Sequence, residues 1–156
     1  MGTTTVSPAE VARFDALAAE WWDPNGPMRP LHRMNPARIG WIADRIARRF
    51  PDPAGVRLLD VGCGAGLAAE ALARRGFDVL GLDAAAETVA AARAHAAGQG
   101  LSLAYRAGAP EDLVAESLRF PVITALEVIE HVPDPAAFAR TLAALLEPGG
   151  LVFLST

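Results

Sequence analysis

Lysine is absent from this 156-residue chain, and all 14 of its basic residues are arginine. We attribute this bias, together with the many alanines, to a GC-rich coding background rather than to a function. Acidic residues number 18, so the formal net charge is −4 at pH 7. A chain with this negative balance is a poor partner for nucleic acid, and we exclude nucleic acid as its main ligand.

Cysteine occurs once, as Cys63, which excludes an internal disulfide and fits a reducing cytoplasm. Cys63 stands between two glycines with no base beside it, so we interpret it as a small filler of a tight turn rather than as a nucleophile. No apolar stretch approaches the length of a bilayer span, and the N-terminus lacks the basic-then-apolar order of a signal peptide. We therefore predict a cytoplasmic protein of a single domain.

Residues 1–55 are predicted to form an N-terminal helical extension. The sequence Ser-Pro-Ala-Glu at 7–10 is a capping box with proline at the first helical position, so a helix begins there. A turn-rich loop then runs to Pro30. Asn35, which a proline follows, predicts the start of a second helix, and the prolines at 51–53 end it.

Residues 56–156 alternate near-continuous apolar segments with helical patterns, which is typical of a parallel sheet with helices on both faces. Strands are expected near 57–61, 77–82, 101–106, 120–126 and 151–155, and helices near 66–75, 86–97, 110–117 and 135–146. A doubly wound sheet with right-handed crossovers places the first strand at the centre. The turn after that strand then lies at the switch point where ligands bind.

The last predicted strand runs into the final residues, Leu-Val-Phe-Leu-Ser-Thr at 151–156. A parallel sheet that ends on an apolar strand has an open edge, which proteins usually cover. We therefore expect this chain to be a fragment of a longer protein and to self-associate through that strand.

The most informative stretch is Leu-Leu-Asp-Val-Gly-Cys-Gly-Ala-Gly at 58–66, with Asp83 at the end of the next predicted strand. This order predicts a buried strand, a glycine turn, a helix and a second strand that ends in a carboxylate. Such an arrangement suits a nucleoside-like ligand with ribose hydroxyls. A dinucleotide site needs the spacing G-x-G-x-x-G, whereas the third glycine here comes one residue early. The spacing therefore argues against a nicotinamide oxidoreductase.

The string D-V-G-C-G-x-G resembles motif I of the class I S-adenosylmethionine-dependent methyltransferases, and Asp83 matches their ribose-binding acid. The resemblance implies a Rossmann-like sheet with the strand order 3-2-1-4-5 in this chain. It also implies S-adenosylmethionine as the cofactor. The expected cofactor-binding residues of this motif are Asp60, Gly62, Gly64, Gly66 and Asp83.

Two further strings narrow the resemblance. The first is Trp-Trp-Asp at 21–23 followed by Pro-Leu-His-Arg-Met-Asn-Pro-Ala-Arg at 30–38, and the second is Leu-Glu-Val-Ile-Glu-His-Val-Pro-Asp-Pro at 126–135. With Pro-Gly-Gly at 148–150, nearly the whole chain is similar to the ubiquinone biosynthesis O-methyltransferase family. That family methylates phenolic hydroxyls of polyprenylated hydroxyphenol and demethylubiquinol intermediates. Its members continue beyond Thr156 with two more strands and with segments that cover the quinol and touch membrane lipid, which implies a peripheral membrane or biosynthetic-complex contact.

Carried over residue by residue, the resemblance assigns cofactor contacts to Arg38, Gly62, Asp83 and Leu126, and a divalent-metal site to Glu127, Glu130 and His131. Arg38 would pair with the methionine carboxylate of the cofactor, or else remain a solvated surface side chain. Leu126 would form an apolar wall against the cofactor, or else pack in the core.

Glu127 and His131 are the candidate catalytic residues, because methyl transfer needs a phenol that is deprotonated or polarised with water excluded. In one scheme Glu127, Glu130 and His131 hold Mg²⁺, Mn²⁺, Co²⁺ or Zn²⁺, which lowers the pKa of the phenol. In another, His131 takes the proton directly. In a third interpretation His131 and Asp134 cap the following turn and the glutamates are solvated.

The remaining aromatic and histidine side chains are less informative. Adjacent tryptophans at a helix end point in different directions, so at most one of Trp21 and Trp22 walls the cofactor or the substrate ring. His32 is either an alternative acid–base group or a solvated loop residue. His95 is expected on an exposed helix face with no functional role.

The sequence thus predicts an S-adenosylmethionine-dependent O-methyltransferase acting on polyprenylated phenols and quinols. One alternative is a methyltransferase of the same fold acting on another small aromatic or on a carboxylate. A second is a truncated module that binds the cofactor without turnover, since the family's C-terminal segments are missing.

Overall fold

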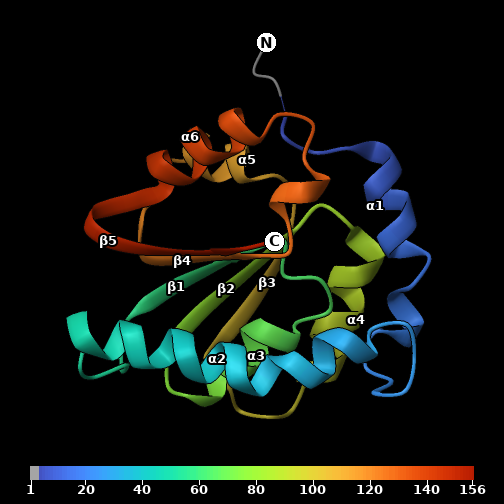
Figure 1. Cartoon of the computed structure of the whole chain (residues 1–156), viewed down its shortest axis with the longest axis horizontal. Helices are drawn as coiled ribbons and strands as arrows, with labels where there is room; N and C mark the ends of the chain where they lie inside the picture. The colour runs from blue at the N-terminus through green and yellow to red at the C-terminus, as the bar shows by residue number, and fades with distance from the viewer. Residues whose placement is uncertain (1–3) are drawn as a thin grey trace.

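The computed structural model describes residues 4–156 and has a layered α/β fold (Figure 1). Its centre is a five-stranded, all-parallel sheet in the order β3-β2-β1-β4-β5. The strands span Arg57–Val61 (β1), Asp78–Asp83 (β2), Leu103–Ala107 (β3), Phe120–Leu126 (β4) and Leu146–Ser155 (β5). The predicted doubly wound parallel sheet with β1 at its centre is thereby confirmed.

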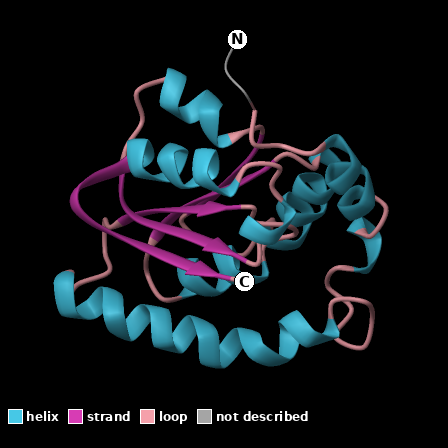
Figure 2. Cartoon of the chain, turned by 45° about the horizontal axis from the view of Figure 1, so that its top comes forward, coloured by secondary structure: helices cyan, strands magenta, loops and turns pink. Residues whose placement is uncertain are grey.

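Helices cover both faces of the sheet, as Figures 1 and 2 show. Helices α2, α3 and α4 lie on one face and α5 and α6 on the other, while α1 lies beside the ends of the strands (Figure 1). Their bounds are Pro8–Asp15 (α1), Arg29–Arg49 (α2), Leu67–Arg74 (α3), Ala86–Ala96 (α4), Pro110–Ala115 (α5) and Pro135–Leu145 (α6), with single 3-10 turns at Ala18–Glu20 (η1) and Ile129–His131 (η2).

Each face of the sheet has its own apolar core. Ile46, Leu72 and Val89 are fully buried between the sheet and helices α2, α3 and α4. Leu113 and Phe138 are buried in the same way between the opposite face of the sheet and helices α5 and α6. Full burial of each such side chain stabilises the fold by about 1.5–3 kcal/mol. Because β1 and β4 are covered on both faces, their sequences are almost continuously apolar.

Helix α2 begins six residues earlier than predicted, at Arg29 rather than near Asn35. Pro30 occupies its first turn, where no backbone N–H is required, and Pro36 lies inside the helix. Asn35 does not cap a helix. Its Nδ2 instead donates to the carbonyl oxygen of Leu67 on α3, at 2.9 Å.

Helix α1 begins at Pro8 as predicted, but the predicted capping box does not form. Ser7 makes no side-chain hydrogen bond at this helix start. The carboxylate of Glu10, the other member of the box, lies beside a histidine described below.

Strand β5 begins at Leu146, earlier than the predicted 151. Leu146 pairs with Phe120, and the next pair is Leu151 with Val122. Residues 147–150, which include the Pro-Gly-Gly sequence, form an irregularity between these two pairs. The strand can therefore begin before the Pro-Gly-Gly sequence.

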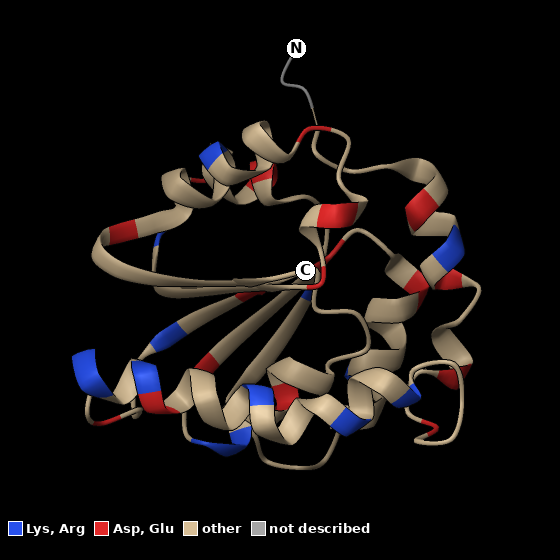
Figure 3. Ribbon diagram, in the orientation of Figure 1, with Lys and Arg blue, Asp and Glu red and all other residues tan. Residues whose placement is uncertain are grey.

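Helix α2 carries six of the 14 arginines and a single acidic residue, Asp44, on an otherwise acidic molecule (Figure 3). Most of these arginines face solvent, but the side chain of Arg38 is only 16% exposed. Within residues 4–156, no helix combines the length and the apolar character needed to cross a bilayer.

Candidate active site

A pocket of about 350 Å³ lies at the carboxyl ends of β1, β2 and β4, the edge where α/β sheets bind ligands. The sheet side supplies its floor and residues 5–38 supply what we call the N-terminal cover. Floor residues include Asp60, Gly62, Gly64, Asp83, Leu126, Glu127 and His131, and cover residues include Glu10, Phe14, Trp21, Met34 and Arg38.

The glycine turn, residues 62–66, presents bare backbone to the pocket. Gly62 and Gly64 have φ angles of 70° and 55°, in the left-handed region that favours glycine. A Cβ on Gly64 would lie 2.4 Å from the ring of Trp21, and a Cβ on Gly62 would lie 2.4 Å from Val128. Side chains at either position would therefore push the walls of the pocket apart.

Two further residues of the turn, Gly66 and Cys63, serve packing. Gly66 does not line the pocket; a Cβ there would lie 2.0 Å from the Tyr105 hydroxyl, so the missing side chain makes room for Tyr105 behind the turn. Cys63 is buried, and burial raises the pKa of its thiol well above the ordinary value. A protonated, buried thiol fits the interpretation of Cys63 as a filler.

Asp83 ends β2 and faces the glycine turn. Its Oδ2 accepts a hydrogen bond from the N–H of Gly64 at 2.8 Å, and its Oδ1 accepts one from the N–H of Ala85 at 2.9 Å. Burial raises the pKa of Asp83, and these backbone N–H groups offset part of the rise. The carboxylate therefore ties β2 to the turn and to the start of α4 while it lines the pocket.

Asp60 is buried and Arg38 is half-buried, and both ionisable side chains have buried atoms with no hydrogen-bond partner. On Arg38 these atoms are Nε and Nη1, and on Asp60 the atom is Oδ2. Asp60 Oδ1 accepts from the hydroxyl of Thr124 at 2.7 Å. Burial raises the pKa of Asp60 to about 7 and lowers the pKa of Arg38. A ligand with one anionic and one cationic group would satisfy both side chains.

Glu127 follows β4 with a φ of 56°, in the left-handed region. Its Oε1 accepts a hydrogen bond from the hydroxyl of Ser155 at 3.0 Å and lies 3.7 Å from Nη1 of Arg38. Its own N–H donates to the carbonyl oxygen of Ser155 at 3.0 Å. Glu127 is thus held toward Arg38 and β5.

His131 lies in the pocket beside α1. Its Nδ1 is 3.0 Å from Oε2 of Glu10, and the ring of Phe14 meets its ring edge-on at 5.4 Å. Sequence reasoning missed Glu10 as a site residue because the capping-box pattern accounted for it. Only the approach of α1 to η2 brings this pair together.

The three predicted metal ligands do not form a metal site. Glu127 is paired with Arg38 and Ser155, His131 Nδ1 faces Glu10, and Glu130 Oε1 is 4.0 Å from His131 Nε2. Within the described part of the chain, residues 4–156, no group of three His, Cys, Asp or Glu side chains could hold a metal ion. These residues therefore do not fit a bound divalent cation.

The two tryptophans point to different sides, as predicted. Trp21 lies on Gly64 and lines the pocket, whereas Trp22 stacks on His95. His32 Nε2 is bonded to the carbonyl oxygen of Trp21 at 2.8 Å, so it has a structural partner rather than free access to the site. His95, which was expected on an exposed helix face, is half-buried and contacts the buried Glu70 as well as Trp22.

This sheet order, with a glycine turn after the central strand and an acid after the next, is the architecture of the class I S-adenosylmethionine-dependent methyltransferases. The chain belongs to the methyltransferase domain family, whose match covers residues 32–156.

Curated relatives agree with this assignment. The chain is 50% identical to the ubiquinone biosynthesis O-methyltransferase of Cereibacter sphaeroides (strain ATCC 17025), over 99% of this chain and 65% of that protein. It is 48% identical to the enzyme of the same name from Sinorhizobium medicae, over 98% of this chain and 64% of that protein. The predicted resemblance is confirmed, and the chain spans about 65% of the length of these relatives.

Solved structures show the same fold. A chain from the complex of the Haloferax volcanii Trm112 methyltransferase activator with a methyltransferase superposes with a TM-score of 0.69 at 26% identity, over 90% of this chain and 58% of the other. Magnesium protoporphyrin IX methyltransferase from Synechocystis PCC 6803, solved with bound S-adenosylmethionine, gives a TM-score of 0.69 at 19% identity, over 93% and 75% of the two chains.

Proposed function

We propose that this chain binds S-adenosylmethionine in the pocket and that the protein transfers its methyl group to a phenolic hydroxyl of a polyprenylated hydroxyphenol or quinol. Membership of the methyltransferase domain family supports the cofactor. The names of the curated relatives, ubiquinone biosynthesis O-methyltransferase, support the substrate class.

The observation that carries the cofactor assignment is that Arg38 and Asp60, beside Asp83, both have buried polar atoms without a hydrogen-bond partner. The amino-acid end of S-adenosylmethionine has a carboxylate for Arg38 and an ammonium group for Asp60. Asp83 would accept hydrogen bonds from the ribose hydroxyls. Each such charge-assisted bond contributes roughly 1.5–3 kcal/mol.

The bound cofactor would supply a methyl group on a sulfonium, which an oxygen nucleophile attacks in line. In our proposal His131 accepts the phenolic proton at Nε2, because its Nδ1 faces Glu10. A carboxylate at Nδ1 stabilises the imidazolium that forms. Phe14, Trp21 and Leu126 provide apolar walls that exclude water from the reacting groups.

The proposed polyprenyl substrate suggests a place at a membrane surface or in a biosynthetic complex, reached from the cytoplasm. The apolar cover residues Leu31 and Met34 line the same pocket and offer a surface for an apolar substrate. The alternative of another small aromatic substrate has no separate support in the site.

The proposal is tested by calorimetric titration of the chain with S-adenosylhomocysteine, followed by assays of methyl transfer to a soluble catechol and to a prenylated phenol. We expect binding with a stoichiometry of one and transfer to the phenols. Binding without transfer to either phenol would instead support a cofactor-binding module. Absence of binding would refute the proposed cofactor.

A further inference from the structure

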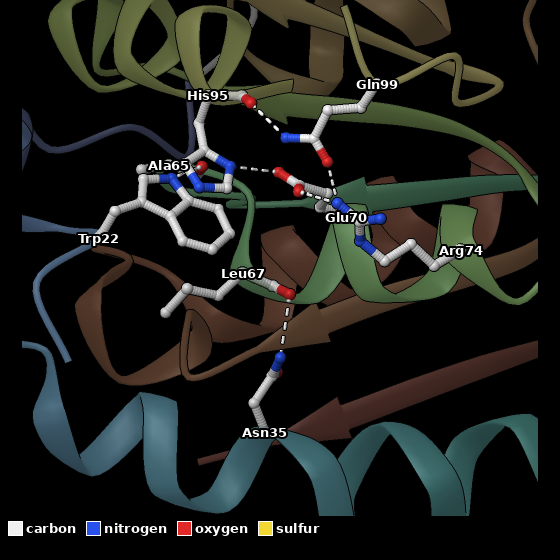
Figure 4. Close-up of polar contacts among 8 residues, drawn as sticks. All are labelled: Trp22, Asn35, Ala65, Leu67, Glu70, Arg74, His95 and Gln99. Carbon is white, nitrogen blue, oxygen red and sulfur yellow. Dashed lines mark hydrogen bonds and ion pairs between the residues drawn. The ribbon is translucent and has the colours of Figure 1, made fainter. Parts of the chain in front are cut away.

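The side chain of Trp22 is held in an unusual stack outside the pocket. Its ring and the imidazole of His95 on α4 lie parallel, with centroids 3.4 Å apart and an interplanar angle of 2° (Figure 4). Aromatic rings usually pack at centroid distances of about 4.5–7 Å. The contact is therefore close and fixes the plane of both rings.

A buried carboxylate fixes the imidazole in turn. Nδ1 of His95 lies 2.7 Å from Oε2 of Glu70 on α3, a residue that is only 3% exposed (Figure 4). The other oxygen of Glu70 accepts a hydrogen bond from Arg74 at 2.9 Å. Both oxygens of this carboxylate are thus engaged, and the imidazole has one orientation.

The other end of Trp22 reaches the glycine turn. Its Nε1 donates to the carbonyl oxygen of Ala65 at 2.9 Å, and Ala65 is fully buried (Figure 4). Among residues 4–156, this is the single side-chain hydrogen bond from the N-terminal cover to residues 62–66. The preceding residue, Trp21, lies on Gly64 and lines the pocket. The two tryptophans therefore bracket the turn from its two sides.

We propose that Trp22 is a positioning residue for the cofactor pocket, held in place by His95 and Glu70. It acts through its neighbours: the bond to Ala65 fixes the turn, and the stack on His95 fixes Trp21 over Gly64. This inference rests on the proposed function, because it concerns the pocket that would hold the cofactor. It predicts that a contact outside the pocket governs how tightly and how long the cofactor is bound.

The test compares S-adenosylhomocysteine affinity and dissociation rate in variants of the stack. Loss of one hydrogen bond and one ring contact in Trp22→Leu should weaken binding about tenfold, mainly through faster dissociation. His95→Ala should weaken it about fivefold, whereas His95→Phe, which keeps a flat ring, should restore most of the affinity. Effects of Trp22→Leu and His95→Ala should not add, because both remove the same stack.

Trp41→Leu is the matched control, since Trp41 is half-exposed on α2 and outside the pocket. It should bind S-adenosylhomocysteine like the wild type. Melting temperatures without ligand separate a general loss of stability from the expected change in dissociation rate. Should Trp22→Leu fail to fold, Trp22→Phe and the His95 pair carry the test.

Wild-type affinity and dissociation rate in Trp22→Leu and His95→Ala would overturn this inference and leave the proposed function intact. Equal weakening in His95→Phe and His95→Ala would overturn the role of the stack. A wild-type chain that does not bind S-adenosylhomocysteine would overturn the proposed function and this inference with it.

Discussion

Asp60 is a carboxylate buried in the sheet with one oxygen that has no hydrogen-bond partner. Such a group costs stability unless a ligand or a proton satisfies it. Burial raises the pKa of Asp60 and of Asp83, but Asp83 is stabilised by two backbone N–H groups and Asp60 by one hydroxyl. Of the two, Asp60 is therefore the stronger source of pH-dependent stability.

Asp60→Asn should change how stability depends on pH. In the folded chain the pKa of Asp60 is about 7, against an ordinary value of 3.8. Between these values folded Asp60 keeps a proton that the unfolded chain has lost, so wild-type stability falls as pH rises through this window. As pH rises from about 4 to about 8, the free energy of unfolding of the variant should increase relative to that of the wild type by on the order of 4 kcal/mol. Urea unfolding at both pH values measures this gain, with the exposed Asp44→Asn as control. Parallel pH profiles for wild type and Asp60→Asn would contradict the prediction.

Asp83→Ala should weaken S-adenosylhomocysteine binding at least tenfold, because it removes the acceptor for the ribose hydroxyls and the bond to Gly64. Calorimetry measures the change. Asp78→Ala is the matched control, since Asp78 begins the same strand and is exposed. An unchanged affinity in Asp83→Ala would remove this residue from the proposed ribose contact.

Glu10→Gln should lower the rate of methyl transfer about tenfold or more and leave S-adenosylhomocysteine affinity nearly unchanged, because the uncharged amide no longer stabilises a protonated His131. His131→Ala should abolish transfer with the same retained affinity. Transfer to a catechol and calorimetry on the same samples check both effects. The exposed Glu20→Gln should behave like the wild type, and full activity in His131→Ala would exclude it as the base.

Among the secondary-structure elements, those whose limits are set by local sequence were predicted closely. The observed β1 and β4 coincide with the predicted 57–61 and 120–126, because apolar runs between turn residues define both. The start of α2 was wrong, since Asn35 finds its partner on α3 rather than at a helix end. The start of β5 was also wrong, because pairing of Leu146 with Phe120 extends the strand across a proline and two glycines.

In the candidate site, too, the residues placed by local sequence were predicted and the pair that depends on distant contacts was not. The glycine turn and Asp83 belong to one continuous β-turn-α-β motif, so the sequence was sufficient to find them. The Glu10–His131 pair depends on how α1 crosses η2, which no local pattern encodes. The expected metal set does not come together in the structure, because Glu127 pairs with Arg38 and Ser155 while His131 Nδ1 faces Glu10.

Gly64→Ala should destabilise the turn and displace Trp21. The variant combines a left-handed backbone with a Cβ placed 2.4 Å from the indole, so we expect a loss of about 2–4 kcal/mol together with weaker S-adenosylhomocysteine binding. Gly98→Ala is the matched control, because Gly98 has a φ of +77° but no neighbour within 4 Å. Urea unfolding of both variants separates the effect of the contact with Trp21 from the effect of the backbone conformation. Equal losses of unfolding free energy would show that Trp21 moves aside without destabilising the fold.

The five-stranded sheet has β5 at one edge, with Val152 and Leu154 exposed at 40% and 43%. An exposed edge strand offers unpaired backbone groups and apolar side chains to another chain. A sample of residues 1–156 should therefore self-associate with rising concentration in sedimentation experiments. Leu154→Arg should shift this equilibrium toward monomer, whereas Val114→Arg, at a similarly exposed position on α5, should not. A monomer at every concentration would contradict this prediction.

The pocket joins the beginning of the chain to residues more than a hundred positions later, since Glu10 and Phe14 face His131 across it. During synthesis, the segments that cover the pocket leave the ribosome long before η2 exists. A nascent chain that ends before His131 lacks one wall of the pocket. The wall that His131 adds to the pocket can therefore form only late in translation, after α1 has been synthesised.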